Sequence, residues 1–371
     1  MSRATLFGFF AIVLGSLLCY GYWTLSVKQG IFSWSIIEPK TAYPDEWNTV
    51  NYIWVPTPNE KKNLQKIIEK RFENRRKVLE KFCLKFKSAG ESAVPPSQLI
   101  STKDKKLTVC YIQKAASTSW NRLVWRLRHN VETIPTGVGG IRSDNLRDIS
   151  QLNFREKQRL VETSLSVITV RHPFARLISG WNNKLNREFI RTHGNTLLRS
   201  MPELVQHFMT EAESPTHALT FERFLAFVIN QSTNRTRVQW IRQLDSHFRP
   251  MLDICCPCDF MYKYVVKVET APDDVWYVLD QIDVAMTTFI SQTNVTSITW
   301  KGNQHMNDAA VLKEFAAHTK DVEHEISSSI RNYFKNVPPE HAHKLIKLYQ
   351  SDFQAFGYSF DVKGLRAGGI T

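Results

Sequence analysis

The feature that most constrains this chain is the segment from Leu107 to Trp120, where an apolar, β-prone run ends at Lys114, followed by three hydroxyl residues at 117–119. Residues 121–130 then read as a basic helix. This strand, loop and helix order can bind a phosphate, because the first backbone N–H groups of a helix have no partner within it and the helix dipole favours an anion. The lysine adds positive charge and the hydroxyls add donors. The segment therefore predicts a cradle for an anionic cofactor.

A second unit of the same kind follows. Residues 165–170 form a run rich in β-branched residues, typical of a buried strand, and Arg171 and then Pro173 lead into a helical pattern. Two such units predict parallel strands that share one carboxyl edge, where α/β sheets bind ligands. Arg171 and Ser179 can hold a second phosphate away from the one at Lys114. The chain has neither G-x-x-x-x-G-K-[ST] nor G-x-G-x-x-G, which argues against an ATPase, a GTPase or a dinucleotide fold.

The charge and the N-terminus indicate the kind of partner and the compartment. A net charge of +13 implies a polyanionic partner, which could be nucleic acid, anionic membrane or acidic glycan. Ala4–Val27 carries no charge across 24 residues, enough to span a bilayer. A cleaved signal peptide is the weaker alternative, because the run ends in bulky Tyr20, Tyr22 and Trp23. We expect a single-pass signal anchor with a short tail and a translocated remainder.

Glycosylation sequons and cysteines point to the same compartment. Sequons begin at Asn230, Asn234 and Asn294, which favours a secretory-pathway lumen and makes nucleic acid a poor partner. Outside the anchor stand five cysteines, an odd number, so at least one stays free or pairs with another chain. The cluster at 255–258 could suggest zinc, but no second pair stands at ligand spacing, so we expect structural disulfides and no metal.

The chain divides into a tail and anchor at 1–27, a lumenal stem at 28–101 and a catalytic domain at 102–371. Residues 61–87 show an irregular apolar helical stripe. This helix could form a coiled-coil stem that makes a homodimer, or it could pack on the catalytic domain, and the pattern does not decide between the two. Residues 131–145 hold three glycines and a proline, which predict a loop.

The two units carry a resemblance to a known family. Residues 113–120 resemble the 5′-phosphosulfate loop of Golgi carbohydrate sulfotransferases, and residues 171–179 resemble their 3′-phosphate motif. Stretches at 247–250, 255–258, 267–270 and 348–358 follow in the order of the branch that contains chondroitin 4-O- and HNK-1 sulfotransferases. The chain departs from the family pattern at Gln113, Ser117 and His172, where proline, cysteine and an acidic residue are usual.

The resemblance implies an α/β, P-loop-like sulfotransferase fold with a central parallel sheet flanked by helices, in a single-pass type II protein of the Golgi membrane. It implies 3′-phosphoadenylyl sulfate (PAPS) as donor and an acidic glycan acceptor, most simply a glycosaminoglycan of the chondroitin or dermatan type. The residues implied to bind PAPS are Gln113, Lys114, Ala115, Ala116, Ser117, Thr118, Ser119, Arg171 and Ser179.

Sulfuryl transfer resembles phosphoryl transfer, in which positioning and electrostatics supply the catalysis. Lys114 would stabilise the bridging oxygen as the nucleotide leaves. A base must accept the acceptor proton, and His247 is the first candidate, with a buried structural histidine as its alternative reading. Glu269 is the second candidate, with an ion pair to Lys267 as its alternative. A catalytically inactive relative that binds glycans or acts as a scaffold is the competing function.

Overall fold

The computed structural model describes residues 27–28, 31–32, 58–87, 96–131, 138–185, 219–233, 235–284 and 328–360. Residues 1–49 and 50–371 form two separate compact units. In the first unit, β1 (Val27–Lys28) pairs antiparallel with β2 (Ile31–Phe32). The anchor predicted for Ala4–Val27 lies outside the described residues except for its last residue. Within the described ranges, no helix has both the length and the apolar character that crossing a membrane requires.

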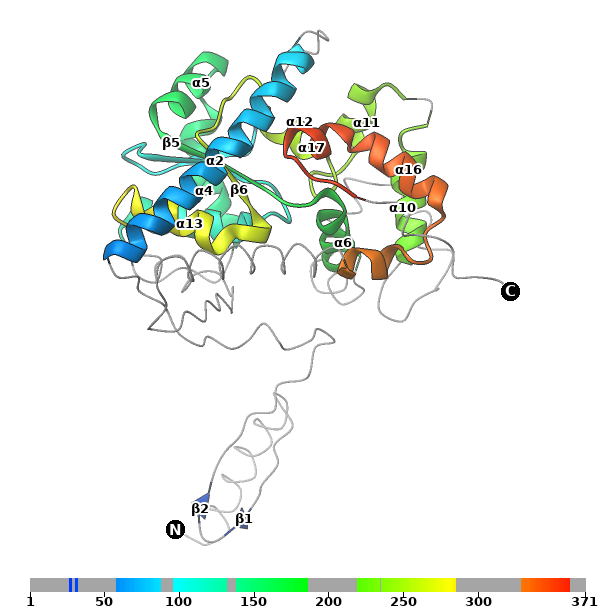
Figure 1. Cartoon of the computed structure of the whole chain (residues 1–371), viewed down its shortest axis with the longest axis horizontal. Coiled ribbons are helices and arrows are strands. Elements are labelled where there is room, and N and C mark those ends of the chain that lie inside the picture. The colour runs from blue at the N-terminus through cyan, green and yellow to red at the C-terminus, as the bar shows by residue number, and fades with distance from the viewer. Residues whose placement is uncertain are drawn as a thin grey trace, which may run out of the picture. The chain divides into compact units, whose positions relative to one another are not determined.

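The second unit is built on a four-stranded sheet in the order β3 (Leu99–Ser101), β4 (Leu107–Cys110), β5 (Leu165–Val170) and β6 (Tyr264–Lys267) (Figure 1). β3 pairs antiparallel with β4, whereas β4, β5 and β6 are parallel. The prediction of parallel strands is therefore confirmed. The carboxyl ends of β4, β5 and β6 lie at one edge, and the two predicted anion-binding turns follow β4 and β5.

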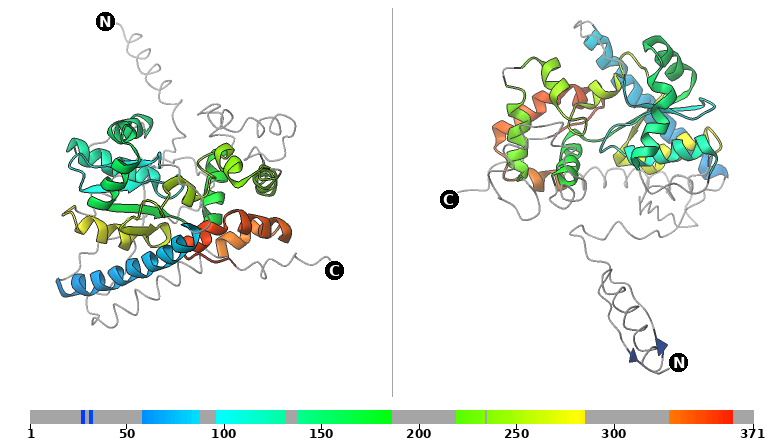
Figure 2. Two further views of the ribbon diagram at one scale, coloured as in Figure 1. Left: turned by 90° about the horizontal axis from the view of Figure 1, so that it is seen from above. Right: turned by 180° about the vertical axis from the view of Figure 1, so that it is seen from behind.

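Helices cover both faces of this sheet, because successive strand residues point to opposite sides. Val109 and Val167 pack in one buried cluster with α3 (Ser117–His129) and α13 (Ala271–Asp280). The neighbouring Ile168 packs in the other cluster with α5 (Phe154–Thr163) and α12 (Met251–Cys255). The short helix η2 (Val268–Thr270) joins β6 to α13. The architecture is mixed α/β, with a sheet between helical layers (Figure 2).

The loop predicted over residues 131–145 is wrong from residue 138 onward, where the structure has α4 (Val138–Ser150). The glycines at its start lower helix propensity, but tertiary packing overrides propensity. Ile141 and Ile149 are buried. Asn145 is also buried and donates from Nδ2 to the backbone oxygen of Asn121 on α3 at 2.7 Å. This hydrogen bond joins α4 to α3.

The helix predicted within residues 61–87 is α2 (Pro58–Lys87), and it packs on the sheet-bearing unit. Of the two alternatives that the sequence left open, the structure has the second. Figure 2 shows α2 running alongside α13. Residues 58–87 and 99–101, which the sequence placed in a stem, thus belong to the same compact unit as the sheet. The buried residues of α2 are Leu64, Ile68, Phe72, Leu79 and Cys83.

Two disulfides fasten the end of α12 and the segment after it to the rest of the unit. Cys83 of α2 pairs with Cys258, and Cys110 at the end of β4 pairs with Cys255. Cys256 is buried and forms no disulfide within the described residues. The expectation of structural disulfides, with one cysteine left over, is confirmed.

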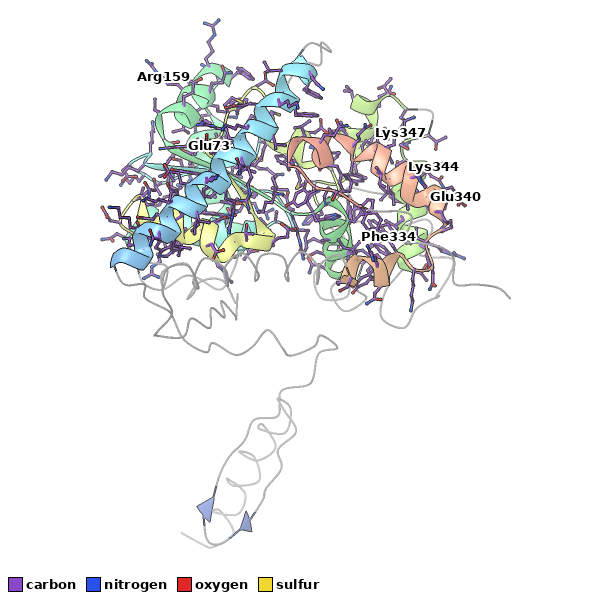
Figure 3. The ribbon with its side chains drawn as sticks, viewed as in Figure 1. Glu73, Arg159, Phe334, Glu340, Lys344 and Lys347 are labelled. Carbon is purple, nitrogen blue, oxygen red and sulfur yellow. A yellow bond between two sulfur atoms is a disulfide. The ribbon has the colours of Figure 1, made fainter. Side chains whose placement is uncertain are left out.

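A third buried cluster lies among the helices α6 (Pro173–Lys184), α10 (Phe221–Asn230), α11 (Arg237–Gln243), α16 (Pro339–Leu348) and α17 (Gln350–Ala355). Phe334 lies inside this cluster, while Glu340, Lys344 and Lys347 lie on the exposed side of α16 (Figure 3). Asn230 is exposed at the end of α10, whereas Asn234 and Asn294 lie outside the described residues. α6 connects this cluster to the sheet, because it begins at the turn that follows β5.

Candidate active site

The turn after β4 has an unusual backbone. Lys114 and Ala116 adopt positive φ angles of 68° and 57°, a region that costs L-residues about 1–2 kcal/mol. The N–H of Ala115 donates to the backbone oxygen of Ile112 at 3.0 Å, which closes the turn. α3 begins directly afterwards, and neither a side-chain cap nor an acidic residue occupies its first turn. The helix start therefore presents its positive dipole end to the space beside Lys114.

Lys114 lies in a strongly cationic environment. Burial, together with the positive charges of Arg171, Lys184 and Arg176, lowers the pKa of Lys114 to about 8. So many cations around one ammonium group are unfavourable unless an anion joins them. A bound phosphate or sulfate would reverse this effect and hold the lysine protonated.

Arg171 connects the two turns directly. It follows β5, and its Nη1 donates to the backbone oxygen of Lys114 at 3.2 Å. Its backbone N–H faces Met251 Sδ at 3.5 Å. Burial lowers the pKa of the Arg171 guanidinium, while the negative charge of Glu269 opposes this shift. The structure thus brings the two predicted phosphate-binding residues to adjacent positions at the same edge of the sheet.

His172 begins α6 as its N-terminal cap. Nδ1 accepts a hydrogen bond from the N–H of Phe174 at 3.2 Å, and Pro173 occupies the first helical turn, as the sequence predicted. Because Nδ1 is an acceptor, Nε2 carries the proton and donates to the backbone oxygen of Ser359 at 3.1 Å. Burial lowers the pKa of His172 and favours this neutral form. His172 is therefore a structural residue of the turn.

Arg176 on α6 connects two segments of the site. The side chain is 1% exposed. Nε donates to the backbone oxygen of Gln113 at 2.9 Å. Nη1 donates to the oxygen of Arg249 at 2.7 Å, and Nη2 donates to the oxygen of Ser246 at 2.8 Å. One arginine on α6 thus holds the Lys114 turn and the segment 246–249 in fixed relation.

The hydrogen bonds of Arg176 place His247 near Lys114. His247 Nδ1 lies 2.6 Å from Asp245 Oδ1, which also accepts the backbone N–H of His247 at 2.9 Å. With Nδ1–H donated to the carboxylate, Nε2 is the basic nitrogen. Burial lowers the pKa of His247, Asp245 opposes this, and the charges of Lys184 and Lys114 lower it further. The imidazole is therefore neutral near pH 7 and able to accept a proton.

Glu269 lies beside Arg171 and has both oxygens engaged. Oε1 accepts the backbone N–H of His172 at 2.7 Å, and Oε2 accepts the hydroxyl of Tyr358 at 2.8 Å. Ser179 is half-buried in the second turn of α6. Of the two candidate bases, His247 lies near Lys114 and Glu269 lies near Arg171.

The remaining predicted residues line the turn and the start of α3. Gln113 and Ala115 are buried, Ala116 and Ser117 are half-buried, Thr118 is exposed and Ser119 is buried. Two residues that the sequence reasoning missed are Asp245, which orients His247, and Tyr358, which holds Glu269. The two-residue spacing of Asp245 and His247 is a signal that could have found the first, whereas nothing local links Tyr358 to Glu269. Across the described ranges, no cluster of three metal-ligating side chains occurs.

Comparison with known proteins identifies the family of the chain. A family model described as "Sulfotransferase family" matches residues 97–359, which cover most of the chain and include both turns. The chain belongs to this sulfotransferase family. This confirms the resemblance drawn from the motifs, and the family makes the chain a sulfotransferase. No solved structure was found to match the chain significantly.

Curated relatives of the chain are carbohydrate sulfotransferases. Carbohydrate sulfotransferase 11 of Mus musculus is 26% identical over 274 residues, which span 70% of this chain and 67% of the relative. Carbohydrate sulfotransferase 12 of Mus musculus is 25% identical over 276 residues, 67% of this chain and 57% of the relative. Carbohydrate sulfotransferase 10 of Homo sapiens is 22% identical over 259 residues, 68% of this chain and 64% of the relative.

Proposed function

We propose that this sulfotransferase transfers the sulfuryl group of PAPS to a hydroxyl of an acidic glycan of the chondroitin or dermatan type. The observation that carries the proposal is the hydrogen bond from Arg171 to the backbone oxygen of Lys114. It joins two strand–turn–helix units at one sheet edge, which suits a nucleotide with phosphates at both ends. The parallel strands β4 to β6, with helices on both faces, support a P-loop-like sulfotransferase fold.

The residues present fit PAPS. The uncapped start of α3 and the ammonium group of Lys114 suit the 5′-phosphosulfate, with residues 113–119 around it. Arg171 and Ser179 suit the 3′-phosphate. The excess of positive charge around Lys114 gives a physical reason for an anionic donor, because a dianionic or trianionic ligand relieves the repulsion among the cations.

The transfer step follows from the positions of Lys114 and His247. The acceptor oxygen attacks sulfur, a new O–S bond forms, and the S–O bond to the 5′-phosphate breaks in line. Protonated Lys114 stabilises the negative charge that develops on the bridging oxygen. Nε2 of His247 accepts the proton of the acceptor hydroxyl, and Asp245 stabilises the resulting imidazolium. The nucleotide product leaves with both phosphates.

The acceptor and location rest on charge and sequence. The relatives named carbohydrate sulfotransferase support a glycan acceptor, and the net charge of +13 supports an acidic one. The chondroitin or dermatan type follows from the resemblance of the later motifs. The apolar segment at 4–27 and the three sequons support a type II protein of the Golgi membrane.

The test is transfer of labelled sulfate from PAPS by the full chain, purified in detergent, to chondroitin, dermatan and desulfated heparan. We expect PAPS-dependent label on chondroitin or dermatan, and disaccharide analysis then gives the sulfated position. Label on heparan alone would contradict the acceptor class. Glycan binding without any transfer would contradict the enzymatic proposal and favour an inactive glycan-binding relative.

A further inference from the structure

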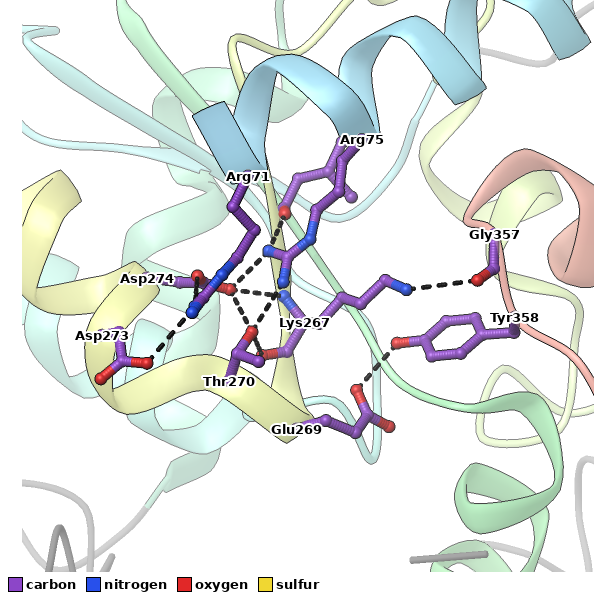
Figure 4. A network of polar contacts seen from close by, with 10 residues as sticks. Arg71, Arg75, Lys267, Glu269, Thr270, Asp273, Asp274, Gly357 and Tyr358 are labelled. Carbon is purple, nitrogen blue, oxygen red and sulfur yellow. Dashed lines mark hydrogen bonds and ion pairs between the residues drawn. The ribbon is translucent and has the colours of Figure 1, made fainter. Parts of the chain in front are cut away.

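Figure 4 shows a polar network that joins segments far apart in the sequence, and Glu269 lies at its edge, bonded to Tyr358. Glu269 lies in η2, directly after β6. One carboxylate oxygen holds the backbone N–H of His172 at 2.7 Å, and the other holds the hydroxyl of Tyr358 at 2.8 Å. The carboxylate therefore binds the Arg171–His172 turn on one side and the end of the described chain on the other.

The segment 357–360 is fastened at two further points. Lys267 Nζ donates to the backbone oxygen of Gly357 at 3.5 Å and lies 4.0 Å from the centre of the Tyr358 ring. The backbone oxygen of Ser359 accepts a hydrogen bond from His172 Nε2 at 3.1 Å. Gly357 has a φ of +62°, which lets the chain turn sharply after α17 toward these partners. The segment thus closes over the Arg171–His172 turn.

The other side of η2 is held by a carboxylate that is fully buried. Asp274 accepts hydrogen bonds from Thr270 Oγ1 at 2.6 Å and from Arg75 Nη1 of α2 at 2.6 Å. It also accepts the backbone N–H of Lys267 at 3.2 Å. Residues on both sides of Glu269 are therefore anchored by protein contacts alone. The carboxylate of Glu269 is set in place before any ligand arrives.

We propose that Glu269 and Tyr358 are positioning residues for the donor site. They hold the Arg171–His172 turn in the conformation in which Arg171 reaches the Lys114 turn, and the segment 357–360 completes the site. This inference rests on the proposed function, because it assigns the network to the same nucleotide site. It gives Glu269 a role other than that of the general base.

Neutralising Glu269 should change the affinity for the nucleotide differently for each of its possible roles. If Glu269 acted only through its charge, Glu269→Gln would remove an anion beside Arg171 and tighten the binding of a phosphate. If Glu269 were the general base, the variant would lose kcat and the acidic limb of its pH profile while nucleotide affinity stayed unchanged. If Glu269 positions the turn, the same variant binds the nucleotide more weakly.

The experiment titrates adenosine 3′,5′-bisphosphate, the expected nucleotide product, into the full chain by calorimetry. The variants are Glu269→Gln and Tyr358→Phe, and the matched control is Tyr333→Phe. Tyr333 also loses a hydroxyl that accepts a hydrogen bond, from Asn182 Nδ2 at 3.1 Å, but it has no contact with Glu269. We expect Kd to rise about tenfold in the two test variants, since hydrogen bonds to a charged group are among the stronger ones. The control should change Kd less than about twofold.

Steady-state kinetics of the same variants complete the measurement, and their melting temperatures check that they are folded. In Tyr358→Phe we expect KM for PAPS to rise while kcat changes less, because the groups that contact the reacting atoms are intact. Tighter binding by Glu269→Gln, or a loss of kcat with unchanged Kd, would overturn the inference. If the wild type binds the nucleotide and both variants bind it with the same affinity, the inference is overturned and the proposed function stands. Failure of the wild type to bind the nucleotide would overturn the proposed function and this inference with it.

Discussion

The turn after β4 and the turn after β5 follow the same strand–turn–helix order at the same edge of the sheet, yet their helices begin differently. α3 begins without a side-chain cap, after two residues with positive φ. α6 begins with a histidine cap and a proline, and its turn is held by Glu269 and Ser359. The first turn presents backbone and one lysine, whereas the second is held mainly by side chains of other segments.

The difference shows how the strained turn is kept in place. The Lys114 turn is braced by arginines of the second unit, because Arg176 and Arg171 donate to the backbone oxygens of Gln113 and Lys114. Strained backbone persists where its surroundings over-determine it. The turn after β5 therefore serves as the support and the Lys114 turn as the open cradle. If so, the two turns should respond differently to substitution.

The largest expected effect comes from removing the charge of the open turn. Lys114→Ala should lower kcat about 10²–10³-fold, the usual cost of losing one group that stabilises developing negative charge. Its melting temperature should stay close to that of the wild type, because removing the ammonium group relieves its repulsion with the neighbouring cations. The matched control is Lys105→Ala, which changes an exposed lysine that also has positive φ. Wild-type turnover of Lys114→Ala would refute the assignment.

Substituting Arg176, which braces the Lys114 turn, should lower the stability of the protein as well as its activity. Arg176→Met leaves three backbone oxygens without their donor, and each unsatisfied group costs about 1–3 kcal/mol. We expect the free energy of unfolding in urea to fall by at least about 3 kcal/mol. Arg176→Lys keeps the charge and should lose less. The control Arg76→Met changes an exposed arginine paired with Glu80 and should cost under about 1 kcal/mol. Equal losses for the two methionine variants would contradict the brace.

A smaller effect should follow from disturbing the packing of α6 on the segment that carries His247. A Cβ on Gly180 would lie 2.5 Å from Cε1 of Phe248, which is fully buried. Gly180→Ala should therefore lower the free energy of unfolding by about 1–3 kcal/mol. Gly140→Ala, also in a helix, meets no heavy atom within 4 Å and should be neutral or stabilising by about 0.5–1 kcal/mol. If both substitutions have the same sign, the close contact is not what sets the position of α6.

The smallest effect is a displacement of the pH profile. The value of kcat/KM reports the free enzyme, which in the proposed mechanism needs His247 neutral and Lys114 protonated. Burial lowers the pKa of His247 below its ordinary value of 6.5, so activity should rise with pH up to that range. Lys114 loses its proton around a pKa of about 8, so activity should fall above that pH. Lys114→Arg should move only the alkaline limb upward, because arginine stays protonated. An unmoved alkaline limb would assign that limb to another group.

The sequence predicted strands β4 and β5, the two turns and their common edge because these features depend on local patterns, whereas it placed the residues of β3 in a stem. Residues 107–110 and 165–170 are short apolar runs, and Pro173 marks a helix start in its own right. Helix α4 was missed because the burial of Ile141 and Ile149 outweighs the glycines at its start. α4 packs against α3 and β3, which both lie earlier in the chain.

The residues that set the site's geometry were harder to predict, since their contacts span the chain. Arg176 reaches segments 63 and 73 residues away, and Tyr358 reaches Glu269 across 89 residues. A motif shows that a glutamate stands after a strand, but it does not show which donors occupy its oxygens. The choice between His247 and Glu269 as base therefore needed the fold.

The most direct test of a single nucleotide site built from both turns compares two ligands. Adenosine 3′,5′-bisphosphate and adenosine 5′-monophosphate differ only in the 3′-phosphate that we assign to Arg171. By calorimetry, the wild type should prefer the bisphosphate by about 100-fold, the scale of charge-assisted hydrogen bonds to a phosphate. Arg171→Ala should bind the two ligands with nearly equal affinity, because the residue that distinguishes them is gone. A preference that persists undiminished in Arg171→Ala would contradict the account.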